Sequence, residues 1–189
     1  MLRKLLTQLL AVFFVPGALA AQAAVPAQQP SSSPVSQRGM DRITKEVRHE
    51  LLLLPYYGVF DNLGYRVAPD GTVTLVGQVS QPTLKSDAEN AVKHVEGVER
   101  VNNEIQVLPA SPMDDQIRMA TYRAIYGNST LAPYSIRAVP PIHIIVSGGH
   151  VTLEGAVSTQ MDKQIAETQA KSVPNVFSVT DNLQVDQSK

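Results

Sequence analysis

The chain has four histidines and no cysteine among its 189 residues, and this limits the chemistry that its side chains can perform. The lack of thiols excludes disulfides, thiolate zinc sites and cysteine nucleophiles. The histidines are His49, His94, His143 and His150. None of them stands in the His-Glu-x-x-His motif of zinc hydrolases. We therefore expect no metal site.

Motifs for other reactions are also missing from the sequence. It contains no glycine-rich phosphate loop and no Gly-x-Ser-x-Gly nucleophile elbow. The carboxylates are scattered, and Asp114-Asp115 is placed to begin a helix, where negative charge is favourable. We therefore predict a protein that is not an enzyme, with no catalytic residue and no cofactor. A hydrolase whose groups come together only in the folded chain is the remaining alternative.

Four residues of one predicted helix are candidates for binding a membrane surface: Arg118, Tyr122, Arg123 and Tyr126. Residues four positions apart share a helix face, so Arg118, Tyr122 and Tyr126 should lie together. A guanidinium pairs with lipid phosphate, and the amphipathic tyrosine ring suits the headgroup region. The competing interpretation places the two tyrosines between the two halves of the protein.

A second candidate for lipid binding is an aromatic stretch in the first half of the chain, Tyr56, Tyr57 and Phe60. It follows a predicted helix whose basic residues we expect to face solvent: Arg42, Lys45 and Arg48. The aromatic side chains either contact lipid or lie in the core or in the interface between the two domains. The formal net charge of −1 gives no reason to expect a nucleic-acid partner, and attraction to an anionic membrane would need a local basic patch.

The N-terminal residues have the pattern of a secretory signal peptide. A positively charged start precedes an apolar run, Leu5–Val15, and small residues suitable for cleavage end at Ala20. The run is shorter than the roughly 20 residues that span a bilayer. We predict a signal peptide over residues 1–20, with cleavage after Ala23 as the alternative, and a disordered linker over residues 21–39.

The rest of the chain contains one segment twice. The run Gly71-Thr-Val-Thr-Leu-Val-Gly77-Gln-Val79-Ser80 matches Gly149-His-Val-Thr-Leu-Glu-Gly155-Ala-Val157-Ser158, and the match continues without a gap. The second copy is longer than the first between its first helix and its first strand. We predict two small domains, residues 40–108 and 114–186, joined by a short linker at residues 109–113.

Hydrophobic spacing gives each copy the order helix, strand, strand, helix, strand. A turn at Pro69-Asp70-Gly71 makes the first two strands antiparallel, and the third strand, Val101–Val107, can pair in parallel. Ser80 and Ser158 are placed to cap the second helix of each copy. The predicted fold class is α+β: two tandem αββαβ modules, each a three-stranded mixed sheet packed on two helices.

The repeated block Gly-x-Val-x-Leu-x-Gly-x-Val, the Ala-Glu of the next helix and the pattern Val-x-x-Val-x-Asn-x-Ile/Leu-x-Val resemble the BON domain family. Two such domains behind a signal peptide are similar to the group of periplasmic proteins that includes osmotically inducible protein Y. The resemblance implies an αββαβ fold, an envelope location, attachment to phospholipid membranes and no catalytic residues. Two stretches depart from the family pattern, Leu54–Phe60 and Leu131–His143, so we expect any function special to this chain there.

We therefore expect a non-enzymatic periplasmic protein that binds phospholipid membranes and supports envelope integrity or tolerance of stress, such as osmotic stress. A soluble periplasmic chaperone, or an adaptor for another envelope protein, is the alternative. No transmembrane helix is expected. A lipid-modified N-terminal cysteine is excluded, because the chain has no cysteine.

Overall fold

The computed structural model describes residues 35–186, so the expected signal peptide and most of the expected linker lie outside the described residues. The first module consists of α1 (Gln37–Leu52), β1 (Asn62–Val67), β2 (Thr72–Val79), α2 (Pro82–Lys93), β3 (Arg100–Asn103) and β4 (Gln106–Val107). The second consists of α3 (Pro112–Tyr126), the 3-10 helix η1 (Ala132–Ile136), β5 (Ile142–Ser147), β6 (His150–Val157), α4 (Gln160–Lys171), β7 (Ser178–Asp181) and β8 (Gln184–Val185).

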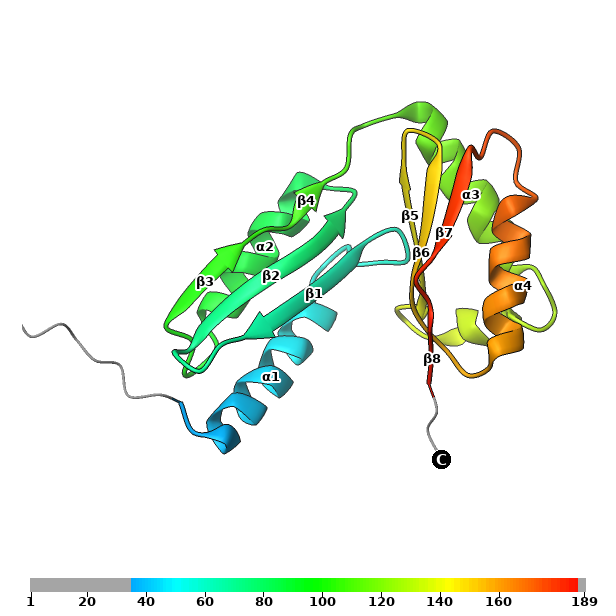
Figure 1. Ribbon diagram of the computed structural model, residues 1–189. Helices are drawn as coiled ribbons and strands as arrows, with labels where there is room; N and C mark the ends of the chain where they lie inside the picture. The colour runs from blue at the N-terminus through cyan, green and yellow to red at the C-terminus, as the bar shows by residue number, and fades with distance from the viewer. Residues whose placement is uncertain (1–34, 187–189) are drawn as a thin grey trace, which may run out of the picture. The chain divides into compact units, whose positions relative to one another are not determined.

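The two modules have the same sheet topology. The strand orders are β1-β2-β3 and β5-β6-β7. In each, the hairpin pair is antiparallel and the later strands run parallel to the central strand, β2 or β6. Two helices cover one face of each sheet (Figure 1). The predicted α+β class with two αββαβ modules is therefore confirmed.

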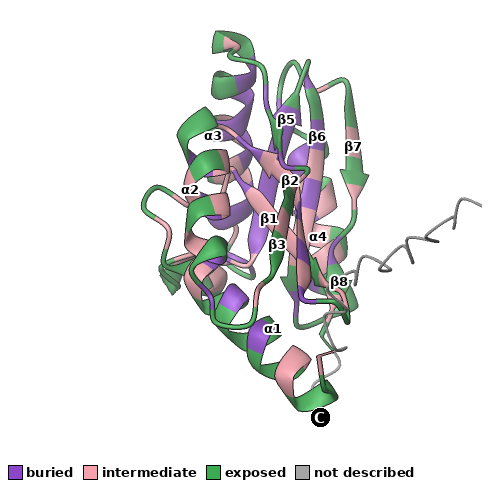
Figure 2. Ribbon diagram, turned by 90° about the vertical axis from the view of Figure 1, so that its left-hand side faces the viewer, coloured by how far each residue is buried: buried purple, intermediate pink, exposed green. Residues whose placement is uncertain are grey.

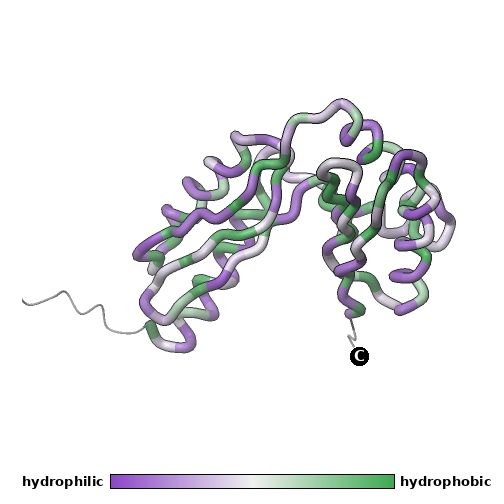
Figure 3. The backbone as a smooth tube through the Cα atoms, turned by 45° about the horizontal axis from the view of Figure 1, so that its top comes forward, coloured by the Kyte–Doolittle hydropathy of each residue, from purple (hydrophilic) through white to green (hydrophobic). Residues whose placement is uncertain are grey.

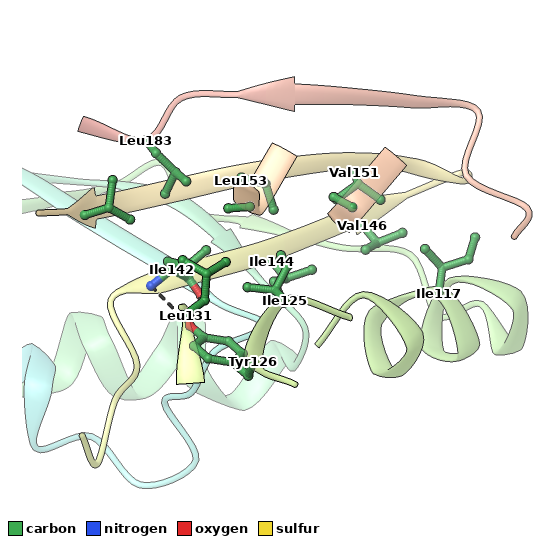
Figure 4. Close-up of a cluster of buried hydrophobic side chains, with 13 residues drawn as sticks. Ile117, Ile125, Tyr126, Leu131, Ile142, Ile144, Val146, Val151, Leu153 and Leu183 are labelled. Atoms are coloured by element: carbon green, nitrogen blue, oxygen red, sulfur yellow. Dashed lines mark hydrogen bonds between the residues drawn. The ribbon is translucent and has the colours of Figure 1, made fainter. Parts of the chain in front are cut away.

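The core of the first module follows the predicted periodicities. On α1, Ile43, Val47 and Leu51 are buried at helical spacing, with exposed positions between them (Figure 2). On β2, Val73 and Leu75 alternate with half-buried residues, as expected for a strand with one covered face. The equivalent core of the second module includes Ile144, Val151 and Leu153 of β5 and β6 (Figure 4).

The first helix begins earlier than the sequence suggested. Gln37 is its first residue, and the Ser36 hydroxyl accepts a hydrogen bond from the Gly39 N–H at 3.3 Å. This side-chain cap satisfies one of the N–H groups that a helix start leaves unpaired. Residues 37–39, which we expected to belong to the linker, are therefore helical.

The predicted third strand is interrupted in both modules. In the first, Asn103 uses its side-chain oxygen to accept the Ile105 N–H at 3.2 Å, and Ile105 turns into the core with 1 % of its surface exposed. In the second, Asp181 and Leu183 make the same contact at 3.0 Å. Pairing resumes at β4 and β8, so each sheet is four-stranded.

The expected serine caps are not formed. The cap residue of α2 is Gln81, whose side chain makes no capping bond, and that of α4 is Thr159, which forms a capping box with Asp162. Ser80 instead donates from its N–H and its hydroxyl to Asp61, at 2.7 and 2.8 Å. The serine thus ties the loop after α1 to the end of β2.

Hydrophobic and hydrophilic residues are interspersed along both modules (Figure 3). Within residues 35–186, no helix is both long enough and apolar enough to cross a bilayer.

Candidate functional site

Arg118, expected at a lipid surface, is a buried residue with 5 % of its surface exposed. Its Nη2 donates to the Val146 carbonyl of β5 at 2.7 Å, and its Nη1 pairs with Asp115, one turn earlier on α3, at 2.5 Å. A buried guanidinium is tolerated only when it is paired in this way. Arg118 therefore joins α3 to the edge strand β5.

Tyr126 is also buried, with 6 % exposed, and its hydroxyl donates to the Ile142 carbonyl at 2.7 Å (Figure 4). Burial raises the pKa of Tyr126 well above its ordinary value, so the hydroxyl remains a donor. The centroid of the Tyr122 ring lies 4.9 Å from that of Tyr126 and 6.2 Å from that of Phe60 of the first module. Tyr122 is thus half-buried between aromatic neighbours.

These positions correct the expectation for α3. Arg118, Tyr122 and Tyr126 do share one face, as the spacing predicted, but that face is turned to the core and to the loop after α1. Of the four candidates on this helix, only Arg123 is exposed. Tyr122 lies against Phe60 of the first module, as the competing interpretation expected. Tyr126 instead belongs to the core of the second module, where it bonds Ile142.

The three aromatic residues of the first module separate into two groups. Tyr56 is 80 % exposed and has a φ of 68°, a left-handed conformation that costs non-glycine residues energy. Tyr57 and Phe60 are half-buried and face the second module. There the Tyr57 ring stacks on that of His143, with 5.8 Å between the ring centroids, and the Phe60 ring meets that of Tyr122. Burial raises the pKa of Tyr57. Only Tyr56 remains free to touch a large partner.

Exposed apolar residues gather where α1 ends. Leu52 is 48 % exposed, Leu53 63 % and Tyr56 80 %. Lys45, Arg48 and Leu52 stand at i, i+3 and i+7 and so share one face of the helix. A shallow depression of about 390 Å³ is lined by Lys45, Glu46, Arg48, His49 and Leu52. We call the set Lys45, Arg48, Leu52, Leu53 and Tyr56 the α1-end surface.

The sequence itself contains a signal for this surface. Leu51, Leu52, Leu53 and Leu54 are consecutive. A helix turns 100° per residue, so a single core-facing stripe cannot bury four successive side chains. Leu51 takes the buried position, and Leu52 and Leu53 are left outside.

Asp61 fixes the loop that follows the α1-end surface. It is 3 % exposed and accepts the two bonds from Ser80 as well as one from the Gly58 N–H at 3.3 Å. In the second module, the Tyr134 hydroxyl takes the corresponding place: it accepts from the Ser158 N–H and donates to Asp162. The two stretches that depart from the family pattern thus have different polar anchors.

These two stretches also meet. Both modules fall within one compact unit of the chain. A depression of about 360 Å³ is lined by Val59 and Phe60 of the first stretch, by Met119 and Tyr122 of α3, and by Ser135, Arg137, Ala138 and Pro140 of the second stretch. The two stretches that depart from the family pattern therefore form a contact between the modules.

No group in residues 35–186 brings together three histidine or carboxylate side chains in a way that could hold a metal ion. His49, His94 and His150 are exposed, whereas His143 is buried on β5.

No curated protein matches the chain. Among solved structures, it is similar to CdsD, a structural protein of the type III secretion system of Chlamydia trachomatis, at 12 % identity and a TM-score of 0.27, over 77 % of this chain and 93 % of that one. It is also similar to the C-terminal domain of CdsD at 10 % identity and a TM-score of 0.27, over 75 % of this chain and 96 % of that one. Neither likeness is close enough to bear on function.

The BON domain family model matches twice, at residues 41–109 and 114–187. Each match begins within the first helix of one αββαβ module and continues past its last strand. Because the two matches together cover most of the sequence, the chain belongs to the BON domain family.

Proposed function

We propose that this chain is a non-enzymatic periplasmic envelope protein that contacts phospholipid membranes through the α1-end surface and supports envelope integrity or tolerance of envelope stress. The observation that carries the proposal is the exposure of Leu52, Leu53 and Tyr56 beside Lys45 and Arg48. Two BON domains support an association with the cell envelope.

The chemistry of this surface suits a headgroup layer. Leucine side chains enter the acyl boundary, tyrosine rings prefer the interface, and nearby cations are attracted to anionic lipid. The left-handed Tyr56 and the buried Asp61 hold the loop so that the Tyr56 ring points away from the core. Glu46 and Glu50 lie near the cations and weaken their field, so binding should be modest and sensitive to salt.

Liposome flotation of the mature protein tests this proposal. Each cation near an anionic surface contributes about 1 kcal/mol, so Lys45→Glu with Arg48→Glu should weaken binding to anionic vesicles by roughly 30-fold or more. Leu52→Ser with Leu53→Ser should weaken binding at low and at high salt, because the lost contribution is apolar. Neutral vesicles should bind the unchanged protein poorly.

A matched control uses two exposed arginines elsewhere in the same module. Arg66 and Arg100 pair with Thr74 and Thr72 of β2, on the sheet face opposite the helices. Arg66→Glu with Arg100→Glu makes the same change in net charge and should leave binding nearly unchanged. If the two double variants lose binding equally, attraction is general and the α1-end surface is not the site. If Arg123→Glu alone abolishes binding, the site lies on α3.

The alternative is a periplasmic chaperone or adaptor that binds another envelope protein. It is favoured by exposed apolar side chains on the second module, Ile136 at 85 % and Phe177 at 78 %. Such a protein would suppress aggregation of an unfolded client or bind a folded partner, and it would fail to float with either kind of vesicle.

Export provides a separate test. We expect the mature protein to begin near Ala21 and to be released with the periplasmic fraction. Intact-mass measurement of the purified native protein locates the N-terminus. Recovery of a soluble cytoplasmic form that retains Met1 would contradict the periplasmic assignment.

A further inference from the structure

The loop after α1 continues the second module's sheet by one hydrogen bond. β5 is an edge strand, paired only with β6. On its other edge, the Ile144 N–H donates to the Val59 carbonyl at 2.7 Å. Figure 1 shows this loop, in cyan, beside β5. An unpaired N–H on an edge strand is a site for added backbone, and here the first module supplies it.

Two residues on the sheet face that the helices do not cover are also buried in this module. His143 and Ile145 alternate with the core residues Ile142 and Ile144, so their side chains point away from α3 and α4. Even so, His143 is only 9 % exposed and Ile145 only 5 %. On β1, the equivalent strand of the first module, no residue is buried. The Tyr57 ring is stacked on the imidazole with an interplanar angle of 23°, and the backbone of Gly58 and Asp61 also lies against it.

His143 is poorly solvated in this contact. Its Nδ1 is buried and has no hydrogen-bond partner among the described residues. Burial lowers the pKa of the imidazole below its ordinary 6.5, while the backbone carbonyls of Asp61 and Gly58 and the carboxylates of Asp61 and Glu154 oppose the shift. Glu154 faces it from β6, where it is the register partner of His143, and Asp61 and Tyr57 face it from the loop. The neutral ring is therefore the form that fits.

We propose that His143 makes the contact between the two modules a latch that loosens in mild acid and exposes the β5 edge. The latch consists of Tyr57, Val59 and Phe60 on the loop and of Tyr122, His143 and Ile144 on the second module. Opening would free the Ile144 N–H together with the aromatic rings of Phe60 and Tyr122. The proposal does not depend on membrane binding.

Proton linkage determines in which direction a change of pH shifts the contact between the modules. Well above pH 6.5, the imidazole is neutral whether the modules touch or separate, and the contact has its full strength. Below pH 6.5, the separated state takes up a proton that the closed state resists. The equilibrium therefore shifts toward separation as the pH falls from 6.5 to the lowered pKa, and it shifts no further below that value.

The chain offers a clean way to measure module separation, because it has no cysteine. Asn90 and Thr168 are exposed on α2 and α4, and changing both to cysteine provides two attachment points for a dye pair. Single-molecule energy transfer is then recorded on the full mature chain between pH 7.5 and 5.5. We expect a population with separated modules to grow at least severalfold across this range.

Variants of His143 identify the group responsible. His143→Phe keeps a flat ring against Tyr57 but cannot take a proton, so its distribution should stay at the neutral-pH form throughout. His143→Gln is the second uncharged variant, for use if phenylalanine perturbs the fold by circular dichroism. The matched control is His150→Phe at an exposed histidine of the same module, which should retain the response of the unchanged protein.

Three results would overturn the latch. One is an identical distribution at pH 7.5 and 5.5 in the unchanged protein. Another is a response that persists in both uncharged His143 variants. The third comes from NMR titration of the four histidines, in which the His143 signal is identified by its loss in the variants: a midpoint at or above 6.5 would show that the ring is not confined in the closed contact.

Discussion

Replacing Leu75 or Leu153 by alanine should lower the free energy of unfolding by about 2–5 kcal/mol. The two leucines hold equivalent places in the repeat and are 1 % and 0 % exposed, on the central strands β2 and β6. Each removal leaves a cavity in a module of fewer than 80 residues, where neighbours have little freedom to close the space. Denaturant unfolding of the mature chain measures the loss.

Thr74→Ala and Thr152→Ala provide the matched controls for this pair. Each threonine is the neighbour of one of the leucines on the same strand, points to the opposite face and is half-buried. Their removal should change stability by about 0.5 kcal/mol or less. A leucine variant as stable as its threonine control would show that this strand does not carry the core of its module.

The sequence was enough to place these leucines because two independent patterns agree on them. The period of two marks Val73, Leu75 and Val79 as one face of a strand, and the second copy repeats the pattern at Val151, Leu153 and Val157. The two copies also agree after the second helix, where Gly97 and Asn175 occupy equivalent positions and both have a positive φ. Where the two copies agree, the fold could be predicted.

The inward packing of Arg118, Tyr122 and Tyr126 on α3 was not predicted from their residue types. Helical spacing correctly placed Arg118, Tyr122 and Tyr126 on one face, but spacing alone does not say whether that face meets water or a sheet. Residue type favoured water. Burial became possible because the Val146 carbonyl and Asp115 accept hydrogen bonds from both Nη atoms of Arg118, and the Ile142 carbonyl accepts one from the Tyr126 hydroxyl. Of the side-chain polar atoms of Arg118 and Tyr126, only the Arg118 Nε is left without a partner among the described residues. Those partners lie far along the chain or depend on rotamers, so one sequence does not reveal them.

The contact between the modules was also hidden from sequence reasoning in part. The two unusual stretches could be recognised because they depart from the repeat, and the structure brings them together around the depression lined by Val59, Phe60, Arg137 and Pro140. The pairing of Tyr57 with His143, however, requires the register of β5 and the path of a loop without regular structure. Neither follows from periodicity.

Replacing Gly77 or Gly155 by alanine should also lower the free energy of unfolding strongly, because the backbone leaves no room for a side chain at these two glycines. Gly77 and Gly155 occupy the middle of β2 and β6, with φ values of 120° and 113°. A side-chain carbon added at Gly77 would lie 2.0 Å from the Asn62 carbonyl oxygen, and one at Gly155 would lie 1.9 Å from that of Pro141. Both oxygens belong to the backbone beside the hairpin, so they cannot turn away as a flexible side chain would. We expect Gly77→Ala and Gly155→Ala each to separate the hairpin strands at this point.

The cost of each alanine has two parts. Holding a non-glycine residue at such a φ costs about 1–3 kcal/mol, and forcing apart well-packed neighbours costs about another 1–3 kcal/mol, which together give a loss of about 2–6 kcal/mol. Gly148→Ala separates the two parts, because Gly148 also has a positive φ, 58°, but an added carbon there meets nothing within 4 Å. The stability lost in Gly148→Ala should be limited to the cost of the positive φ. In denaturant unfolding it should be smaller than the losses in Gly77→Ala and Gly155→Ala. If Gly148→Ala costs as much as Gly155→Ala, backbone conformation alone explains these glycines, and the close approach of Pro141 to β6 does not constrain the second sheet.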